Sequence, residues 1–367
     1  ILFWAMPAYA TGLDLTSKAA VLVDGASGDI LYQENADLQC YPASVTKIMT
    51  LVLALEAVEQ GEASLEDQVV TSELAASMGG SQVYLYTGET RTLDEMLIAV
   101  AVGSGNDASV AVAEHIGGSL EQFVERMNQR AQELGMTGTH FVNPHGLHDA
   151  EHYTTAGDLA ILAYHAIQVP KFLEYTSIYE YDFRPDPKPL KLWNTNRLLK
   201  WYEGTDGMKT GFTTEAGYNL VATVERDGLR LISVVLGVPV AKGHFTESMK
   251  LLNYGFNNYS YEQLYSAGDD ITTCPVKKGK VDSVPIEVAE NIGMLQQKGV
   301  QSEFSVEYDM SQSLSAPLAK GDKAGELILL RDGTEICRYD LVTAEAVEKA
   351  GLGKIFVKLF NSMGIMI

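Results

Sequence analysis

The sequence predicts an α/β protein of the α+β type, in which helices cover one antiparallel sheet and a small all-β domain and a C-terminal amphipathic helix follow. The length is the first reason, because 367 residues correspond to about two domains. The second reason is that β patterns bracket a helical middle. The third is that short β-rich runs alternate with Gly, Pro and Lys turns from about residue 261. We expect domains over residues 11–260 and 261–344 and a helix over 345–367.

Two hairpins frame the larger domain. Each consists of two apolar runs around turn residues, namely 19–24 and 30–33 around Gly25-Ala-Ser-Gly28, and 218–225 and 230–238 around Arg226-Asp-Gly-Leu229. Because these strands come from both ends of the domain, we expect them to form one antiparallel sheet with helices packed over it.

Helical patterns fill the region between the hairpins. They cover residues 94–116, 119–134 and 156–168, and Pro170 ends the last one. Residues 45–58 are nearly all apolar, which is typical of a helix that is buried on every side.

The N-terminal end is similar to a targeting signal. Residues 1–10 are an apolar stretch that ends in Ala8-Tyr9-Ala10, an A-x-A cleavage pattern. We expect a signal peptide remnant and a mature extracytoplasmic protein that starts near Thr11. The alternative is an ordinary apolar N-terminal strand.

The C-terminal end is amphipathic. Apolar residues from Leu352 to Ile367 follow one helical face, and Lys354 and Lys358 lie on the other. The stretch is too short and too charged to span a bilayer, so we expect a helix that lies in a membrane interface. The alternative is a helix that docks on the protein's own core.

Composition argues against several classes of function. The net charge of −21 argues against a nucleic-acid partner, because a phosphate backbone requires a basic surface. Cys40, Cys274 and Cys337 are too few and too scattered for a disulfide framework and fit no zinc pattern, although a Cys274–Cys337 bridge stays open. The seven histidines include no H-E-x-x-H pair, so we predict neither a metal site nor a cofactor.

The first chemical motif, Ser44-Val-Thr-Lys47, begins the buried helix. Residues i and i+3 share a helical face, so the Lys47 amine can reach the Ser44 hydroxyl. Burial lowers the proton affinity of a lysine, which makes Lys47 a base for a nucleophilic Ser44, and helix N-terminal amides favour an oxyanion. A capping serine followed by a surface lysine gives the same pattern. However, this is the only S-x-x-K in the chain, and Lys47 is the only cation of the apolar run.

The second motif, Ser104-Gly-Asn106, follows an apolar run and lies on a tight turn between helices. Ser104 can relay a proton, and the Asn106 amide can hold a substrate carbonyl. Taken alone, an ordinary capped turn explains the pattern equally well.

The third motif, Lys209-Thr-Gly211, opens the strand region before the second hairpin. Lys209 and Thr210 can hold a terminal carboxylate, and Gly211 lets a substrate backbone come close to an edge strand. Taken alone, a charged strand start explains this pattern too.

The three motifs together carry more weight than any one of them. They occur in the order S-x-x-K, S-x-N and K-T-G, 60 and 105 residues apart, which is typical of class A β-lactamases and penicillin-binding proteins. The chain resembles low-molecular-mass penicillin-binding proteins, specifically the D-alanyl-D-alanine carboxypeptidases of the penicillin-binding protein 5 type. The resemblance is close over residues 17–256 and includes Pro42–Lys47, Ala76–Gln82, Asn143–Leu147, Tyr153–Ala156 and Gly204–Gly211.

The resemblance implies a serine β-lactamase/transpeptidase-like fold and a serine-type D-Ala-D-Ala carboxypeptidase that acts on peptidoglycan stem pentapeptides. It implies that Lys47 deprotonates Ser44, which attacks the penultimate D-alanine and is also acylated by β-lactams. Ser104 and Asn106 would assist proton movement and orientation.

The same resemblance assigns the substrate-binding residues. Lys209 and Thr210 of the K-T-G motif, which Gly211 completes, would hold the substrate carboxylate. The backbone amides of Ser44 and Phe212 would form the oxyanion hole. The β domain would be a stalk, and the terminal helix would anchor it on the outer face of the cytoplasmic membrane.

Two departures from the family pattern and three alternatives remain. His244 occupies a position where some relatives carry an arginine-type residue, so we expect carboxylate binding to depend more on Lys209 and Thr210. Phe212, which follows the K-T-G motif, varies among relatives and affects only the expected substrate preference. A class A β-lactamase requires an E-x-x-L-N pattern that is missing between Ser104 and Lys209. A transpeptidase or endopeptidase would share the acyl-enzyme, and a non-catalytic wall-binding protein would have eroded motifs.

Overall fold

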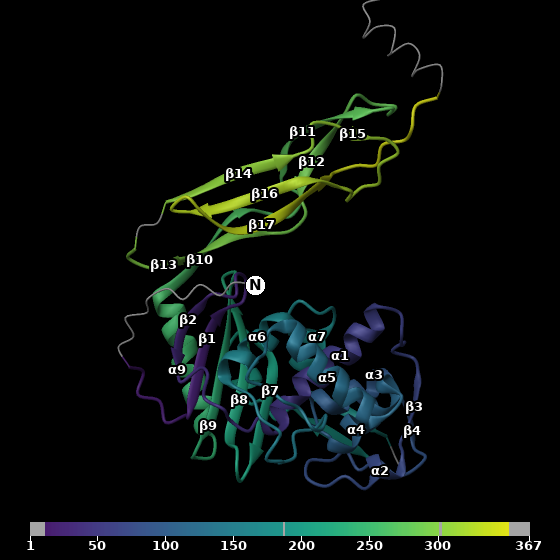
Figure 1. Cartoon of the computed structure of the whole chain (residues 1–367), viewed down its shortest axis with the longest axis vertical. Helices are drawn as coiled ribbons and strands as arrows, with labels where there is room; N and C mark the ends of the chain where they lie inside the picture. Colours follow the sequence, from purple (N-terminus) through teal and green to yellow (C-terminus); the bar gives the residue numbers. More distant parts are fainter. Residues whose placement is uncertain (1–11, 186–187, 301–302, 352–367) are drawn as a thin grey trace, which may run out of the picture. The chain divides into compact units, whose positions relative to one another are not determined.

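The computed structural model describes residues 12–185, 188–300 and 303–351 (Figure 1). The chain divides into two compact units between Asn257 and Asn258, close to the predicted boundary at residue 260. The signal remnant predicted over residues 1–10 lies outside the described residues.

The first unit is built on a five-stranded antiparallel sheet. Its strand order is β2 (Ile30–Glu34), β1 (Ala19–Asp24), β9 (Leu229–Val238), β8 (Gly217–Arg226) and β7 (Thr205–Thr213). Both predicted hairpins are confirmed, and β1 pairs with β9, so the two ends of the unit meet at the centre of the sheet. The two-residue turn between β8 and β9 is Asp227-Gly228, with both residues at positive φ, which suits the twist of a tight hairpin.

Both faces of this sheet are covered, so its strands are apolar on both sides. Val21 and Val23 belong to the core shared with the helical layer. On the other face, a Cβ on Gly255 of helix α9 (Gly243–Asn258) would press into Leu22 and Leu231, so α9 lies directly against the strands. Figure 1 shows α9 on one side of the sheet and the remaining large helices on the other.

The helical layer places the chemical motifs. Its elements are η1 (Ala43–Thr46), α1 (Lys47–Glu59), α2 (Glu73–Ala76), α3 (Leu93–Ala101), α4 (Asn106–Gly117), α5 (Leu120–Leu134), α6 (Ala156–Ala166), α7 (Phe172–Ser177) and α8 (Leu198–Trp201). Helix α1 is buried over most of its surface, as its apolar sequence predicts, and it packs among α3, α4, α5 and α6.

The helix predicted over residues 94–116 is two helices. Helix α3 begins with a capping box, in which Thr92 and Glu95 exchange side-chain to main-chain hydrogen bonds, and it ends at Ala101. Ser104 has a φ of 56°, which no continuous helix allows, and α4 starts at Asn106. The break carries the S-x-N motif, which therefore lies on the inter-helix turn that was expected of it.

Two short strand pairs complete the first unit. They are β3 (Gln68–Val70) with β4 (Thr90–Thr92), and β5 (Glu180–Arg184) with β6 (Leu190–Trp193).

The second unit is all-β, as predicted. Its six-stranded sheet has the order β14 (Phe304–Met310), β16 (Lys323–Arg331), β17 (Thr334–Thr343), β12 (Ser283–Val288), β11 (Asp270–Lys277) and β15 (Leu314–Ser315), and a two-stranded sheet joins β10 (Tyr259–Tyr265) to β13 (Ile292–Gln297). A core of residues such as Val284, Ile286 and Leu327 lies beneath them. All three cysteines are free thiols, so there is no Cys274–Cys337 bridge.

The C-terminal helix does not begin at residue 345. Val347 pairs with Leu318 and Lys349 pairs with Gly279, because Val347 fills the apolar core of the β unit. The rest of the predicted amphipathic segment, from residue 352, lies outside the described residues. Among the helices that the structure describes, none has the length and apolar character needed to cross a bilayer.

Candidate active site

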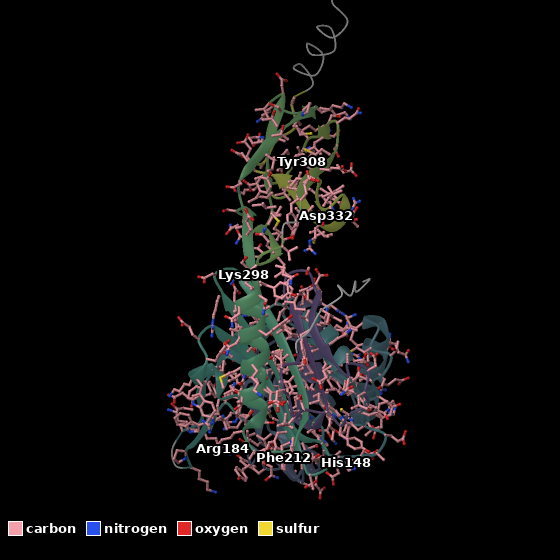
Figure 2. All side chains as sticks on the ribbon, turned by 90° about the vertical axis from the view of Figure 1, so that its left-hand side faces the viewer. His148, Arg184, Phe212, Lys298, Tyr308 and Asp332 are labelled. Carbon is pink, nitrogen blue, oxygen red and sulfur yellow. The ribbon has the colours of Figure 1, made fainter. Side chains whose placement is uncertain are left out.

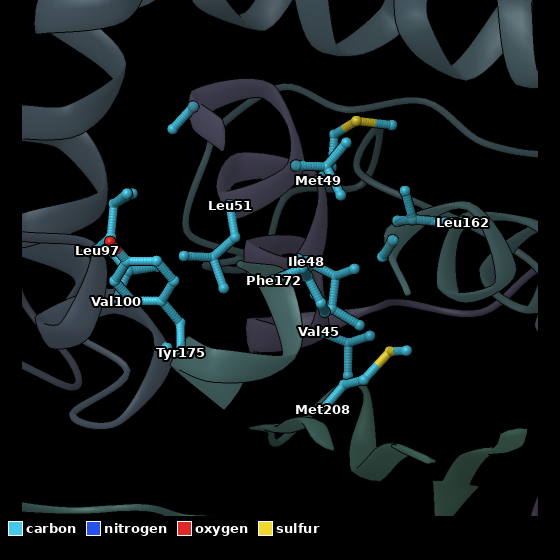
Figure 3. Close-up of a cluster of buried hydrophobic side chains, with 14 of the residues drawn as sticks. Val45, Ile48, Met49, Leu51, Leu97, Val100, Leu162, Phe172, Tyr175 and Met208 are labelled. Carbon is cyan, nitrogen blue, oxygen red and sulfur yellow. The ribbon is translucent and has the colours of Figure 1, made fainter. Parts of the chain in front are cut away.

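The turn that carries Ser44 is fixed by packing on both sides. Val45 lies in one buried cluster with Ile48 of α1, Phe172 of α7 and Met208 of β7 (Figure 3). Ser44 itself belongs to the 3₁₀ turn η1, which runs directly into α1. The serine therefore sits one turn before the buried lysine, as the S-x-x-K spacing predicts.

Two glycines let neighbouring segments approach this turn. A Cβ on Gly211 of β7 would lie 2.7 Å from the Pro42 carbonyl oxygen and 3.0 Å from the Ser44 amide nitrogen. Gly146 has a φ of +85°, and a Cβ there would overlap the Ala43 carbonyl oxygen. Both positions require glycine because main-chain atoms, which cannot rotate away, occupy the space.

The Lys47 amine has three hydrogen-bond partners. Its Nζ lies 3.0 Å from Ser44 Oγ, 2.7 Å from Asn106 Oδ1 and 2.6 Å from the His145 carbonyl oxygen. The last two atoms accept hydrogen bonds only. A neutral amine has two hydrogens and one lone pair, so donating both hydrogens to these acceptors leaves the lone pair for the Ser44 hydroxyl.

The surroundings of Lys47 favour this neutral form. The side chain is fully buried, and burial holds the pKa of its amine well below the usual 10.5. The positive charge of Lys209 lowers the pKa further, whereas the Asp107 carboxylate raises it. The lowered pKa favours the unprotonated amine, which lies in contact with the Ser44 hydroxyl.

The S-x-N motif lies beside this amine. Asn106 accepts from Lys47 and donates from Nδ2 to the Gly79 carbonyl oxygen at 2.7 Å, which fixes the orientation of its amide. Ser104 lies beside the same cavity as Ser44. Asp107, which was not predicted, accepts from the amides of Val83 and Leu85 and so holds the neighbouring segment in place.

A loop that sequence reasoning did not assign a role supplies the third partner of Lys47. Asn143 Oδ1 accepts from the amides of His145 and Gly146 at 3.2 and 2.6 Å, and its Nδ2 donates to the Leu147 carbonyl oxygen at 3.0 Å. These bonds shape the turn that presents the His145 carbonyl. The Asn-Pro and Gly turn residues were the available signal.

Two buried histidines in this region stay neutral. Burial lowers the pKa of His145 to about 3 and the pKa of His152 to about 4. His152 Nδ1 accepts from the Val142 amide at 3.0 Å, so its Nε2 carries the proton and donates to Thr46 Oγ1 at 2.7 Å. The ring thus ties the nucleophile turn to the adjacent loop.

The K-T-G motif lies on β7, where its lysine and threonine are close to Thr195. The Lys209 amine lies 3.2 Å from the Thr210 carbonyl oxygen and 3.5 Å from Thr195 Oγ1, and the Thr195 and Thr210 hydroxyl oxygens are 2.6 Å apart. Burial lowers the pKa of Lys209 to about 7. Thr195 was not predicted, because no local motif marks it.

Strand β7 is aligned with the nucleophile turn by a buried amide. Asn219 of β8 donates from Nδ2 to the carbonyl oxygens of Tyr41 and Pro42 at 2.8 and 3.0 Å, and its Oδ1 accepts from the Gly237 amide at 2.8 Å. Because β8 also carries Thr223, Glu225 and Arg226, one more polar residue in this strand gave no local signal.

These residues surround one cavity of about 610 Å³. It is lined by Ser44, Ser81, Ser104, Thr195, Arg197, Trp201, Thr210, Gly211, Phe212, Tyr218, Ala241, Lys242, His244 and Phe245. The structure therefore brings the three motifs together, with Lys47, Asn106 and Lys209 buried around the cavity. His244 is buried but also lines it.

The described residues include no cluster of three or more His, Cys, Asp or Glu side chains that could hold a metal. The chain does contain His148-Asp-Ala-Glu-His152, which has the H-x-x-E-H spacing of some zinc enzymes and was overlooked in the histidine pattern. Both ring nitrogens of His152 are already hydrogen-bonded to protein groups, so this spacing forms no metal site here.

A serine in contact with a buried amine of lowered pKa, close to a second buried lysine and two threonine hydroxyls, is typical of an enzyme that works through a serine acyl intermediate. The sequence profile described as "D-alanyl-D-alanine carboxypeptidase" matches residues 6–240, and that of the "Penicillin-binding protein 5, C-terminal domain" matches residues 259–349. The chain belongs to the D-alanyl-D-alanine carboxypeptidase family and is a serine-type D-Ala-D-Ala carboxypeptidase, as the three motifs predict.

Individual relatives agree with this assignment. The D-alanyl-D-alanine carboxypeptidase DacF of Bacillus subtilis is 41% identical over 338 residues, which cover 91% of this chain and 87% of that protein. Penicillin-binding protein 5 from Haemophilus influenzae is structurally similar with a TM-score of 0.71 at 37% identity, covering 93% of this chain and 100% of that one. Penicillin-binding protein D2 from Listeria monocytogenes in its ampicillin-bound form has a TM-score of 0.60 at 35% identity, covering 67% of this chain and 99% of that one.

Proposed function

We propose that Ser44 is the nucleophile of this carboxypeptidase and that Lys47 is the base that activates it. The observation that carries the proposal is the set of contacts around the Lys47 amine. Two acceptors use its hydrogens, so its lone pair is directed at Ser44 Oγ, 3.0 Å away. A positioned base of lowered pKa is what a serine hydroxyl needs to attack a carbonyl.

The reaction then has two halves. In the first, Lys47 takes the proton of Ser44 while Oγ attacks the carbonyl carbon of the penultimate D-alanine of a stem pentapeptide. The carbon–nitrogen bond breaks, and the departing D-alanine amine takes up the proton that Lys47 had accepted, relayed through Ser104, so that Lys47 is neutral again. In the second half, water attacks the ester, gives up one proton, and restores the Ser44 hydroxyl.

The substrate is held at its terminal carboxylate. Burial alone lowers the pKa of Lys209 to about 7, but a bound carboxylate raises it again and so favours the charged amine. The Thr195 and Thr210 hydroxyls supply directed hydrogen bonds. The amides of Ser44 and Phe212 form the oxyanion hole. Support for this placement comes from Gly211, which allows β7 to lie within contact distance of the Ser44 amide.

β-Lactams would acylate Ser44 because they imitate the D-Ala-D-Ala end. The ampicillin-bound relative from Listeria supports this proposal. Among the described residues that line the cavity there is no carboxylate to activate water, so the adduct should hydrolyse slowly, unlike that of a β-lactamase. Slow release of nitrocefin product after stoichiometric labelling is the expected result.

The site of action would be the outer face of the cytoplasmic membrane. The peptidoglycan substrate class supports an extracytoplasmic location, and the apolar segment before Thr11 supports export by a signal peptide. The amphipathic pattern beyond residue 352 supports attachment by a helix that lies in the interface, with the β domain as a stalk.

Mass spectrometry after incubation with penicillin tests the assignment of Ser44. The wild type should gain one covalent adduct on the peptide that contains Ser44 and should release D-alanine from a stem pentapeptide. Ser44→Ala should lose both, whereas Ser77→Ala, at a serine outside the cavity, should keep both. An adduct that persists in Ser44→Ala would show that another residue is the nucleophile.

A further inference from the structure

The cavity that holds Ser44 has an aromatic wall. Five rings form an unbroken chain along it, namely Phe212 of β7, Tyr218 of β8, His244 and Phe245 of α9, and Trp201 of α8. Successive ring centroids are 4.4, 5.4, 4.0 and 5.4 Å apart. Four separate elements thus contribute rings to one surface.

The two ends of this aromatic wall are open. Phe212 is 54% exposed and Trp201 is 53% exposed. Large apolar side chains gain stabilisation when they are buried, so two such rings at the surface of a cavity are notable. Phe212 is labelled in Figure 2. Rings that line a cavity and remain uncovered are available to pack against a bound group, because aromatic pairs contribute beyond the area that they bury.

His244 makes the middle of the wall rigid and uncharged. Its ring is nearly parallel to Tyr218, with 6° between the planes, and its Nδ1 is buried without a hydrogen-bond partner, so packing holds the ring. Burial lowers its pKa to about 4, so the ring is neutral at physiological pH. The wall is therefore suited to an apolar group and does not have to desolvate a charge at His244.

The aromatic wall lines the same cavity as two of the residues proposed to bind the terminal carboxylate of the leaving residue. The proposed function places the terminal carboxylate at Thr195, Thr210 and Lys209, and the side chain of that residue is attached to the same Cα as the carboxylate. The first two of these residues line the cavity together with Trp201 and Phe245. The cavity of about 610 Å³ also includes Ser44 and Ser104, so it holds the reacting end of the stem peptide together with the leaving residue. A D-alanine methyl group is too small to cover the half-exposed Trp201 ring that lines the same cavity.

We propose that the aromatic wall is a subsite for the side chain of the leaving residue, and that it lets the enzyme remove a terminal D-amino acid with an aromatic side chain as well as D-alanine. Trp201 and Phe245 are the specificity-determining residues, because Trp201 lines the cavity and is half exposed, and the buried Phe245 packs against it edge to face. The inference rests on the proposed carboxylate site and on the Ser44 acyl-enzyme.

A pair of pentapeptides that differ only in the last residue tests this subsite. One ends in D-Ala-D-Ala and the other in D-Ala-D-Phe, and released amino acid is measured by chromatography with the full-length wild type. We expect the kcat/KM values to agree within about tenfold, since a pocket that tolerates the larger group discriminates weakly. Discrimination against D-Phe by more than about 100-fold would overturn the inference.

Variants then locate the effect. Trp201→Leu and Phe245→Leu should each lower the ratio of kcat/KM for the D-Phe peptide to that for the D-Ala peptide by about two- to tenfold, the usual contribution of one ring pair. Trp193→Leu is the matched control, because Trp193 is an exposed tryptophan on β6 that does not line the cavity, and it should leave the ratio unchanged. An unchanged ratio in Trp201→Leu and Phe245→Leu would refute the subsite.

The failure of the subsite can be told apart from the failure of the proposed mechanism. If the D-Ala peptide is cleaved through a Ser44 adduct and the D-Phe peptide is not, the subsite alone is wrong. If no Ser44 adduct forms with either peptide or with penicillin, the proposed mechanism is wrong, and the subsite, which rests on it, is wrong too.

Discussion

Replacing Gly146 by alanine should distort the turn that carries Ser44, although Gly146 lies in a different loop. Gly146 has a φ of +85°, where an alanine costs about 1–2 kcal/mol. A Cβ there would also overlap the Ala43 carbonyl oxygen and lie 2.9 Å from Thr46 Oγ1. Forcing extra atoms into such a packed place adds about 1–3 kcal/mol, so the expected loss in unfolding free energy is about 2–5 kcal/mol.

The same clash should lower activity. Relief requires the loop or the turn to move, and either movement takes the His145 carbonyl or Ser44 away from the Lys47 amine, which lies 2.6 and 3.0 Å from them. A misplacement of about 1 Å can cost about 100-fold in rate. The assay is the second-order rate of acylation by a fluorescent penicillin, with urea unfolding measured in parallel.

Gly135→Ala is the matched control for Gly146→Ala. Gly135 ends α5 with a φ of +84°, but a Cβ there would meet nothing within 4 Å. It should lose only the backbone part, about 1–2 kcal/mol, and should acylate like the wild type. Equal stability losses in the two variants, or normal acylation in Gly146→Ala, would refute the close approach as the reason for this glycine.

Two other predictions concern the base and the terminal segment. Lys47→Ala should lower the acylation rate by at least about 100-fold, the usual contribution of a positioned base; stopped-flow labelling measures it, and near-normal acylation would show that Lys47 is not the base. Deleting residues 352–367 should release the protein from membranes with its carboxypeptidase activity intact, as fractionation and D-alanine release report. The cut must follow residue 351, because Val347 belongs to the β-unit core, and continued membrane association of the shortened chain would contradict the anchor.

The sequence was sufficient to predict the parts of the fold whose signal is local. The β8–β9 hairpin follows from apolar runs around Asp227-Gly228, and the burial of α1 follows from its uniform apolarity. The residues within each of the three motifs are close in sequence, so the contact between Ser44 and Lys47 could be predicted from the helical spacing alone. The helix prediction over 94–116 ran through the break between α3 and α4 because helical patterns lie on both sides of it, although Gly103-Ser104-Gly105 interrupts the apolar run and the S-x-N motif was itself expected on a turn.

The supporting residues of the site could not be predicted because they act across long sequence separations. Asn143 shapes a loop whose carbonyl reaches Lys47, and Asn219 binds the main chain of Tyr41 and Pro42 from another strand. Each looks like an ordinary polar residue until the fold brings it into place. Thr195 could not be predicted either, because only the hydrogen bond between its hydroxyl and that of Thr210 in the folded chain indicates its role.

The pH dependence of the limiting acylation rate at saturating penicillin tests the state of the Lys47 amine most directly. Because burial holds the pKa of this amine well below 10.5, the rate should reach its plateau well below pH 10.5 and should fall as the pH drops through the lowered pKa and the amine becomes protonated. A rate that climbs by about tenfold per pH unit from neutrality toward pH 10, as for an ordinary lysine, would contradict the account.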